Sequence, residues 1–322
     1  MKCLVTGGAG FIGSHIIERL LREHQDVICL DNFDPYYNPE IKERNISPFM
    51  HDEHFTLIRG DIRDESLLVS VLSDVEVVFH EAAQAGVQAS TENPLQSHDV
   101  NATGTLNLLK SAVEADVKRI ICASSSSVYG TVDRLPFNEC HPVCPVSPYG
   151  VSKLMAEHYC RVFSDLYGLS SVVLRYFTVY GPRMRPDLAI HIFTTQALKN
   201  EPLIIFGTGD RTRDFTYIDD ITDANMMSLT NGNGVYNIGG GHRISIRMLA
   251  EKIIEMTGSS SVIQHTDAKK GEAEHTCADI LKAHRELGWK PKISLDQGIR
   301  KYIEWVTTHQ ESRPATIDPR YS

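Results

Sequence analysis

The first strand, turn and helix of the chain restrict its fold more than any other stretch. Residues Lys2–Thr6 form a short apolar run that ends in the glycine-rich segment GGAGFIG at residues 7–13. Helical periodicity follows over residues 14–23, through Ile16, Ile17, Leu20 and Leu21. A glycine turn between a strand and a helix lets the backbone approach a pyrophosphate, which rests on the helix N-terminus. The spacing GxGxxG in this context therefore predicts a dinucleotide-binding unit.

The residue that ends the next strand indicates which dinucleotide binds. The apolar run Val27–Leu30 leads directly to Asp31. An acidic side chain at this place accepts hydrogen bonds from the ribose hydroxyls of adenosine and repels a 2′-phosphate. The sequence therefore predicts a preference for NAD over NADP.

Further strand and helix units of similar length follow, and they indicate an α/β fold with a doubly wound parallel sheet. The third strand would carry Asp61 and Ile62 to the carboxyl edge of the sheet, where an adenine could lie between an acceptor and an apolar side chain. Asp61 could equally be the N-cap of the next helix. Residues 75–80 and 119–123 are later strand candidates, and Asn93-Pro94 is a helix start.

The segment SPYGVSK, residues 147–153, carries a catalytic pattern. Ser147 and Pro148 are expected as the N-cap and first residue of a helix, so that Tyr149 and Lys153 share one face a turn apart. A phenol is a poor base near neutral pH, but an ammonium group beside it favours the phenolate. The pair is therefore a candidate acid/base dyad. Taken alone, the pattern could also be a tyrosine and a lysine that share a helix face by chance.

A serine cluster, Ser124–Ser127, follows the strand candidate at residues 119–123. Ligands bind at the carboxyl ends of the strands in doubly wound sheets, and Tyr149 must reach the same place. Hydroxyl groups there could bond a substrate oxygen without adding charge. The alternative is an ordinary serine-rich loop.

Composition excludes several classes of protein. The 322 residues can form a large core and two domains or subdomains. A net charge of -9 gives no basic surface for nucleic acid, and no apolar run approaches the roughly 18 residues of a membrane span. Met1 leads directly into the first strand, which leaves no room for a signal peptide, so we expect a cytoplasmic protein.

The seven cysteines are scattered along the chain. Cys3, Cys29 and Cys122 lie in apolar, strand-like runs, so we expect them to be reduced and buried. Cys140 and Cys144 lie in a proline-rich loop, but no second ligand cluster with zinc-like spacing follows them. We therefore expect no metal site.

Motifs of one kind recur along nearly the whole chain. Besides the glycine turn, Asp31 and SPYGVSK, they are GDIRD at residues 60–64, AAQAGV at 82–87, SSSSVYG at 124–130, LRYFTVYGPR at 174–183, RDFTYIDD at 213–220, NIGGG at 237–241 and ADILKAHRELGWKP at 278–291. This set resembles the extended short-chain dehydrogenase/reductase family, in its nucleotide-sugar epimerase and dehydratase branch.

The resemblance implies an NAD-binding Rossmann domain over residues 1–176 plus about 214–241. The remaining residues, about 177–213 plus 242–322, would form a smaller C-terminal domain that binds a nucleotide sugar. A homodimer is also implied, in which the helices that begin near Asn93 and Ser147 pair between subunits. The apolar residues of these helices could equally well pack inside one subunit.

The resemblance assigns three sets of site residues. The catalytic group would be Ser125, Tyr149 and Lys153. The dinucleotide would be held by Gly7, Gly10, Phe11, Ile12, Gly13, Asp31, Asn32, Asp61, Ile62, Gln84, Tyr149, Lys153 and Tyr176. A uridine diphosphate sugar would be bound by Ser126, Ser127, Thr178, Arg185, Arg213 and Lys269. Lysine stands at the last position where the family usually has arginine, and the choice between Lys269 and Lys270 is open.

The reactions of this branch share one first step. The tyrosinate removes the C4 hydroxyl proton while the C4 hydride passes to NAD, which gives a 4-keto sugar. A 4,6-dehydratase also needs an acid/base pair, and its TDE motif is replaced here by Ser125–Ser127, so we exclude dehydration. A 4-epimerase needs only that the keto sugar turn over in its pocket and take the hydride back on its other face.

The substrate depends on other positions. Thr178, the serine cluster and the segments 34–37 and 182–187 resemble UDP-glucuronate 4-epimerases. A C5 carboxylate needs several donors, which the serine cluster, Thr178 and Arg185 could supply, although Arg185 could also be a solvated loop residue. Gln88 departs from the arginine common in acidic-sugar enzymes. We predict epimerisation of UDP-glucuronate to UDP-galacturonate, with UDP-glucose 4-epimerase as the alternative. A decarboxylating UDP-xylose synthase and a non-catalytic NAD-binding regulator are minor alternatives.

Overall fold

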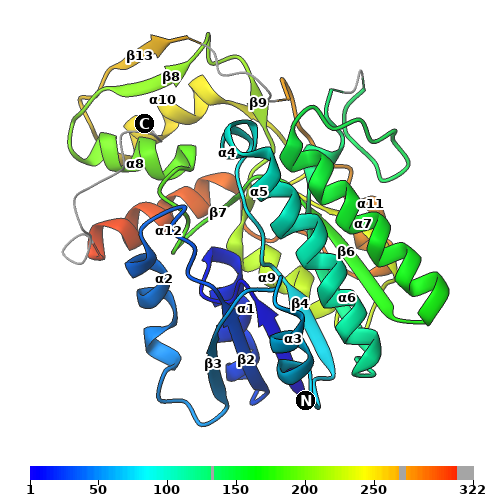
Figure 1. Ribbon diagram of the computed structural model, residues 1–322. Coiled ribbons are helices and arrows are strands. Elements are labelled where there is room, and N and C mark those ends of the chain that lie inside the picture. Colours follow the sequence, from blue (N-terminus) through cyan, green and yellow to red (C-terminus); the bar gives the residue numbers. More distant parts are fainter. Residues whose placement is uncertain (132–133, 268–272, 310–322) are drawn as a thin grey trace.

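A parallel sheet forms the centre of the protein (Figure 1). The computed structural model describes residues 1–131, 134–267 and 273–309, and within them seven strands join this sheet in the order β11-β6-β5-β4-β1-β2-β3. The strands are β1 (Lys2–Thr6), β2 (Asp26–Asp31), β3 (Phe55–Arg59), β4 (Val77–His80), β5 (Arg119–Ser125), β6 (Ser170–Tyr176) and β11 (Gly234–Ile238). The predicted doubly wound α/β fold is confirmed.

The core lies in two layers because alternate residues of a strand point to opposite faces of the sheet. Cys3 and Val5 of β1 belong to one hydrophobic cluster, and Leu4 belongs to another. The helices α1 (Phe11–Arg22) and α9 (Ile218–Met227) cover the first face. The second face is covered by α3 (Glu65–Val71), α6 (Gly104–Glu114) and α7 (Pro148–Tyr167). The strands are thus buried on both sides, as their nearly continuous apolar sequences require.

The strand order reverses beside β1. From β1 the chain passes outward through β2 and β3, and it then returns to β4 on the other side of β1. Short elements follow the strands at this edge: α2 (Pro39–Ile46), η1 (Ser47–Phe49), α4 (Val87–Glu92) and η3 (Ser126–Val128). A crevice at the carboxyl ends of the strands, where the order reverses, is the usual ligand site of such sheets.

Asn93-Pro94 begins a helix, as predicted, but the helix is not regular. The Asn93 side chain accepts a hydrogen bond from the Gln96 backbone N–H at 3.2 Å. The helix then runs from α5 (Pro94–His98) through a π-helical stretch, η2 (Asp99–Thr103), into α6. The apolar spacing on both sides is that of an α-helix, so the sequence pattern did not predict this interruption. Such π-helical stretches are frequent at functional sites.

Smaller elements beside the sheet come mainly from the C-terminal part of the chain, where β8 and β13 lie together in the upper part of Figure 1. They are β7 (Val179–Tyr180), α8 (Ala189–Leu198), β8 (Leu203–Phe206), β9 (Thr212–Arg213), β10 (Thr216–Tyr217), β12 (Ile244–Ser245), α10 (Ile246–Thr257), β13 (Ile263–Thr266), α11 (Leu281–Glu286) and α12 (Leu295–Thr308). α9 and β11 return to the central sheet, as expected.

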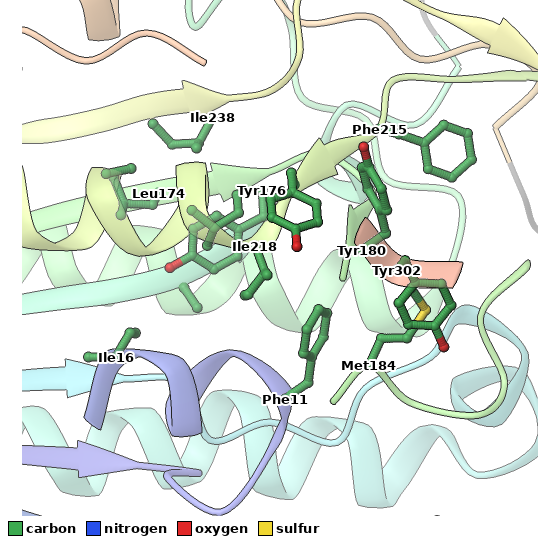
Figure 2. Packing of buried hydrophobic residues seen from close by; sticks show 14 of the residues in the cluster. Phe11, Ile16, Leu174, Tyr176, Tyr180, Met184, Phe215, Ile218, Ile238 and Tyr302 are labelled. Atoms are coloured by element: carbon green, nitrogen blue, oxygen red, sulfur yellow. The ribbon is translucent and has the colours of Figure 1, made fainter. Parts of the chain in front are cut away.

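One hydrophobic cluster extends from the sheet into this C-terminal part. Figure 2 shows Ile16 of α1 and Leu174 of β6 near one end of this cluster, with Phe215 and, from α12, Tyr302 toward the other. The cluster therefore contains residues from both predicted domains. The limits of those domains remain a prediction.

The cysteines follow the expectation. Cys3, Cys29 and Cys122 are buried and free, whereas Cys140 and Cys144 are exposed. Among the described residues, no group of three or more His, Cys, Asp or Glu side chains is arranged to hold a metal ion. No helix in the described ranges has both the length and the apolar character needed to cross a membrane.

Candidate active site

A cavity at the carboxyl edge of the sheet brings the predicted dinucleotide residues together. It is bordered by the turns after β1, β2, β3 and β4, by the ends of β5 and β6, and by the first turns of α7. The predicted residues that line it are Gly7, Gly10, Phe11, Ile12, Gly13, Asp31, Asn32, Asp61, Ile62, Gln84, Tyr149, Lys153 and Tyr176. Arg185, predicted to bind the sugar, lines the same cavity. The Tyr149 and Lys153 dyad and the glycine turn therefore line the same cavity.

The glycine turn is shaped for a backbone approach. Gly7 has φ +65°, and a Cβ at Gly13 would lie 2.4 Å from the Gly7 carbonyl oxygen. The turn leads into α1, whose first backbone N–H groups have no partner within the helix. An anionic pyrophosphate fits this helix N-terminus. The cradle thus matches the requirement of a dinucleotide such as NAD.

Asp31 is held in place by three donors. Its carboxylate accepts hydrogen bonds from the backbone N–H groups of Ala9 at 3.1 Å and Phe33 at 2.8 Å. The Lys42 ammonium donates to Asp31 Oδ1 at 3.3 Å, and both side chains are buried. Lys42 also lines the cavity. The sequence reading missed Lys42, because a lysine in α2 eleven residues after Asp31 follows no motif.

Asp61 faces the cavity and is not a helix N-cap. The side chain of Asp64 instead caps α3, by accepting a hydrogen bond from the Leu67 backbone N–H. Asp61 accepts hydrogen bonds from Asn32 Nδ2 at 2.9 Å and from Arg63 Nη2 at 2.7 Å. The hydrogen bond from the Arg63 side chain lowers the pKa of Asp61 to about 2. The N-cap alternative for Asp61 is therefore wrong, and the residue is a fixed anion at the cavity wall.

The start of α7 holds the dyad as the sequence predicts. Ser147 is the N-cap, and its hydroxyl accepts a hydrogen bond from the Gly150 backbone N–H at 3.1 Å. Lys153 is only 4% exposed, one turn after Tyr149. A Cβ at Gly150 would lie 2.6 Å from the Ser127 carbonyl oxygen. Glycine at this position thus lets the serine cluster pack directly against the first turn of α7.

A carboxyl group that the sequence analysis did not assign to the site lines the same cavity as the dyad. Glu81, directly after β4, accepts a hydrogen bond from the Tyr176 hydroxyl at 2.8 Å, and the Asn225 amide of α9 donates to the same hydroxyl at 2.8 Å. Burial raises the pKa of the Glu81 carboxyl to about 7, although the Tyr176 hydrogen bond and the Lys153 ammonium act in the opposite direction. The sequence offered one indication of this role, because Glu81 is a charged residue directly before a segment of mainly small, apolar residues.

The π-helical stretch ties the loop after β4 to α7 through Asn101. Its side-chain oxygen accepts from the Gln84 backbone N–H at 2.7 Å, and its Nδ2 donates to the Gln84 carbonyl at 3.0 Å. The same Nδ2 lies 2.9 Å from the Ser152 hydroxyl, next to Lys153 in the helix. Asn101 therefore fixes a wall of the cavity relative to the dyad.

A buried ion pair supports the helix behind the dyad. Glu157, one turn after Lys153, accepts from Arg175 Nε at 2.9 Å and from Nη2 at 2.7 Å. It also accepts a short hydrogen bond from the Ser124 hydroxyl. Both charged side chains are nearly inaccessible to water. This network joins α7 to the ends of β5 and β6, and Ser124 is the serine of the cluster that lines the cavity.

Ser125, predicted as catalytic, is not among the residues that line the cavity, and neither are the described substrate residues other than Arg185. The Ser125 hydroxyl bonds the Ser127 hydroxyl at 3.1 Å and accepts from the Ser127 backbone N–H. The Thr178 carbonyl accepts from the Thr216 backbone N–H at 2.9 Å. Arg213 donates to the Thr212 carbonyl at 3.0 Å. The roles predicted for Ser125, Ser126, Ser127, Thr178 and Arg213 stay predictions, and Lys269 lies outside the described residues.

Comparison with known proteins places this geometry in a family. A family model described as GDP-mannose 4,6 dehydratase matches residues 4–302. The chain belongs to this family. This agrees with the predicted extended short-chain dehydrogenase/reductase.

Several 4-epimerases are similar to this chain over nearly their whole length. A putative UDP-glucose 4-epimerase of Methanocaldococcus jannaschii is 40% identical over 314 residues, which are 96% of this chain and 99% of the relative. A UDP-glucuronate 4-epimerase of Thermodesulfobacterium geofontis is 39% identical, with 94% and 95% covered. The crystal structure of a UDP-glucuronic acid 4-epimerase from Bacillus cereus, in complex with UDP-glucuronic acid and NAD, has a TM-score of 0.91 at 37% identity and covers 96% of this chain and 99% of its own.

The family name includes a dehydration that the cavity does not favour. Elimination across C5 and C6 needs an acid and a base near the sugar, and the positions of the expected pair are Ser126 and Ser127 here. Glu81 is a carboxyl in the cavity, but it comes from β4 and is bonded to Tyr176. Within this family, the described residues therefore suit a reaction that needs the Tyr149 and Lys153 pair alone.

Proposed function

We propose that the protein is an NAD-dependent UDP-sugar 4-epimerase that interconverts UDP-glucuronate and UDP-galacturonate. The observation that carries this proposal is the common cavity, which Tyr149 and Lys153 line together with the glycine turn and Asp31. The UDP-glucuronate 4-epimerases of similar sequence and fold support the choice of substrate.

The residues of this chain hold the cofactor and move one proton. The N-terminus of α1 binds the pyrophosphate, and Asp31 binds the adenosine ribose. When bound, NAD accepts the hydride from C4 of the sugar and returns it to the opposite face. Tyr149 takes the proton of the C4 hydroxyl and later gives it back, while the Lys153 ammonium stabilises the phenolate. Ser125 is the proposed third catalytic group, and it bonds the C4 oxygen.

The sugar nucleotide is bound on the side of the cavity that the C-terminal part borders. We assign this role to Ser126, Ser127, Thr178, Arg185, Arg213 and Lys269, as predicted. Arg185 is the cation placed to meet the C5 carboxylate, because it lines the cavity with the dyad. The proposed domain division, residues 1–176 plus about 214–241 and 177–213 plus 242–322, follows the same separation of roles.

A second candidate is a UDP-glucose 4-epimerase. Arg185 is already paired with Asp187, at 3.0 Å between Nε and Oδ1, so Arg185 is not an unbalanced cation beside the sugar. A neutral hydroxymethyl group at C5 suits such a site. The similarity to a putative UDP-glucose 4-epimerase points the same way.

The deciding experiment is NMR of the products formed from UDP-glucuronate and, separately, from UDP-glucose. We expect UDP-galacturonate from the first substrate and no UDP-xylose. Faster conversion of UDP-glucose would refute the substrate assignment, and no turnover of either sugar would refute the function. The Tyr149→Phe variant serves as the control, because it should lose turnover and still release stoichiometric NAD on denaturation.

Two further assignments belong to this proposal. We infer a homodimer formed through α5, α6 and α7, whose outer faces carry exposed apolar side chains such as Leu95 and Leu166. We also infer a cytoplasmic location, and the free cysteines support a reducing compartment.

A further inference from the structure

Arg185, the cation proposed to bind the sugar carboxylate, already forms an ion pair with Asp187. Arg185 donates to Asp187 through Nε at 3.0 Å and through Nη2 at 3.2 Å. The Tyr36 hydroxyl donates to Asp187 Oδ2 at 3.0 Å. These three side chains join the loop after β2 to the loop after β7. Arg185 is therefore one half of a fixed ion pair.

The pair lies where a sugar substituent would meet it. Arg185 and Tyr36 line the cavity that contains Tyr149 and Lys153. The side chains of Arg185 and Asp187 keep only 22% and 20% of their surface exposed. Burial alone would raise the pKa of Asp187, but the Arg185 guanidinium and the Tyr36 hydroxyl hold this pKa below its ordinary value. Asp187 is thus a carboxylate near neutral pH, bonded to two residues that line the cavity.

The geometry of the pair leaves part of the guanidinium available for recognition. A guanidinium has five N–H donors, and Asp187 uses one on Nε and one on Nη2. The Nη1 edge can still donate to a second carboxylate. A neutral substituent, in contrast, would leave a half-buried cation without a counter-charge if Asp187 were absent, which is unfavourable.

We propose that Asp187 determines the specificity of the sugar site, because it balances Arg185 and so lets the site accept a neutral hydroxymethyl group at C5 as well as a carboxylate. This inference rests on the proposed function, since it needs a UDP-hexose in the cavity. It extends that function from one substrate to a pair of substrates that differ only at C6. Wild-type protein binds both sugars, and the charge of Asp187 reduces the preference for the acidic one.

The test measures binding, so that it does not depend on turnover. Calorimetric titration of NAD-loaded Tyr149→Phe protein with UDP-glucuronate and with UDP-glucose gives the ratio of the two dissociation constants. The added change Asp187→Asn keeps the shape of the side chain and removes its charge. We expect the ratio to move about tenfold toward UDP-glucuronate, with tighter binding of the acid and weaker binding of the neutral sugar.

Two further variants separate pairing from general charge. Asp34 lines the same cavity and accepts hydrogen bonds from the Tyr36 backbone N–H and from Gln96. Asp34→Asn removes an equal charge and keeps a side-chain oxygen to accept from the Tyr36 backbone N–H, so the ratio should stay within about twofold of its starting value. The double variant Arg185→Met, Asp187→Leu replaces the pair by apolar groups. It should retain UDP-glucose binding and lose at least about tenfold in UDP-glucuronate binding.

The outcomes are distinct. Loss of UDP-glucuronate affinity in Asp187→Asn would overturn the inference and make Asp187 a residue that only orients Arg185. An equal shift in Asp34→Asn would overturn it too, because the cause would then be the overall charge of the cavity. Absence of binding of both sugars to the parent protein would overturn the proposed function itself. If Asp187→Asn does not fold, the double variant decides by the same ratio.

Discussion

Glu81, which lines the cavity, changes its charge within the neutral pH range. Its carboxyl pKa is raised by burial to about 7, from an ordinary 4.5. The groups that face it are Lys153 from α7, Tyr176 from the end of β6 and the Asn225 amide from α9. The folded protein therefore binds this proton more tightly than the unfolded chain does, and the stability of the fold is linked to its titration.

The linkage predicts how Glu81 affects stability. Below about pH 4.5 the carboxyl is protonated in both states and costs nothing. As the pH rises to about 7 and above, the free energy of unfolding falls by up to ~3 kcal/mol, and Glu81→Gln should avoid this fall. Melting temperatures between pH 5 and pH 8 test this prediction. The melting temperature of the variant should rise relative to that of the wild type as the pH increases. Glu92→Gln, at an exposed position, is the control, and parallel curves for Glu81→Gln would contradict the prediction.

At this scale the sequence identifies residues that stand in motifs and misses residues that act through a spatial partner. Tyr149, Lys153 and Asp31 were predicted from spacing and position, and all three line the cavity. The ion pairs of Lys42 and Asp187 were not predicted, because they depend on charges that the fold brings to them. Pairing across loops has no periodicity in a sequence.

The N-terminus of α7 is the element on which the dyad depends. Ser147 caps it, is 6% exposed, and holds the Gly150 backbone N–H, one residue after Tyr149. The helix runs for 20 residues to Tyr167, so the loss of the cap should loosen its first turn and leave the remainder folded.

We predict that Ser147→Ala lowers both stability and turnover. The loss of the cap should cost about 1 kcal/mol of unfolding free energy. The turnover rate should fall by more than the loss of folded protein accounts for, because Tyr149 lies in the loosened turn. Ser294→Ala is the matched control: Ser294 caps α12 with a capping box at an exposed position. Urea unfolding and epimerase rates on the same preparations should show similar stability losses and a rate loss in Ser147→Ala alone. Equal rates in the two variants would place Tyr149 outside the chemistry.

Element boundaries show where sequence reasoning stops. The caps at Asn93 and Ser147 were predicted correctly, because capping chemistry is local. The π-helical stretch at Asp99–Thr103 was not predicted, since it serves contacts of Asn101 with a distant loop. Local rules thus locate the ends of helices, and tertiary contacts decide their interior irregularities.

At the scale of the whole molecule, α7 carries a row of partly exposed side chains along its outer face. The residues Val151, Met155, His158, Val162 and Leu166 follow one another at helical spacing along this helix. Of these, Leu166 is 69% exposed and Val151 is 45% exposed. A stripe of this kind on a long helix suits a second copy of the same helix.

We predict a dimer in solution, with a mass near twice the 36.0 kDa of the chain. Light scattering after size exclusion gives this mass directly. Val162→Asp places a charge in the middle of the stripe and should yield a monomer, because an unpaired carboxylate in an apolar interface is unfavourable. Leu281→Asp on α11, where the native side chain is 60% exposed, should remain dimeric. A dimer in both variants would show that another surface forms the contact.

The fold class followed from the sequence, because repeated strand and helix units admit few arrangements. Membership in the family followed from the set of motifs, whereas the order of the strands was not predicted. The shared hydrophobic core did not follow, since Tyr180 and Tyr302 reach it from segments with no visible link to α1.

The last strand of the central sheet has a consequence for how the chain can be made. β11 forms the edge next to β6 and is supplied by residues 234–238, far later than the other strands. While the ribosome has delivered only the first two hundred residues, β6 is an apolar strand with an open edge, a known hazard for association with other chains. A fragment cut after the sixth strand would keep that hazard permanently. The first two hundred residues therefore cannot complete the central sheet by themselves, because β6 is paired on this side only after β11 has been made.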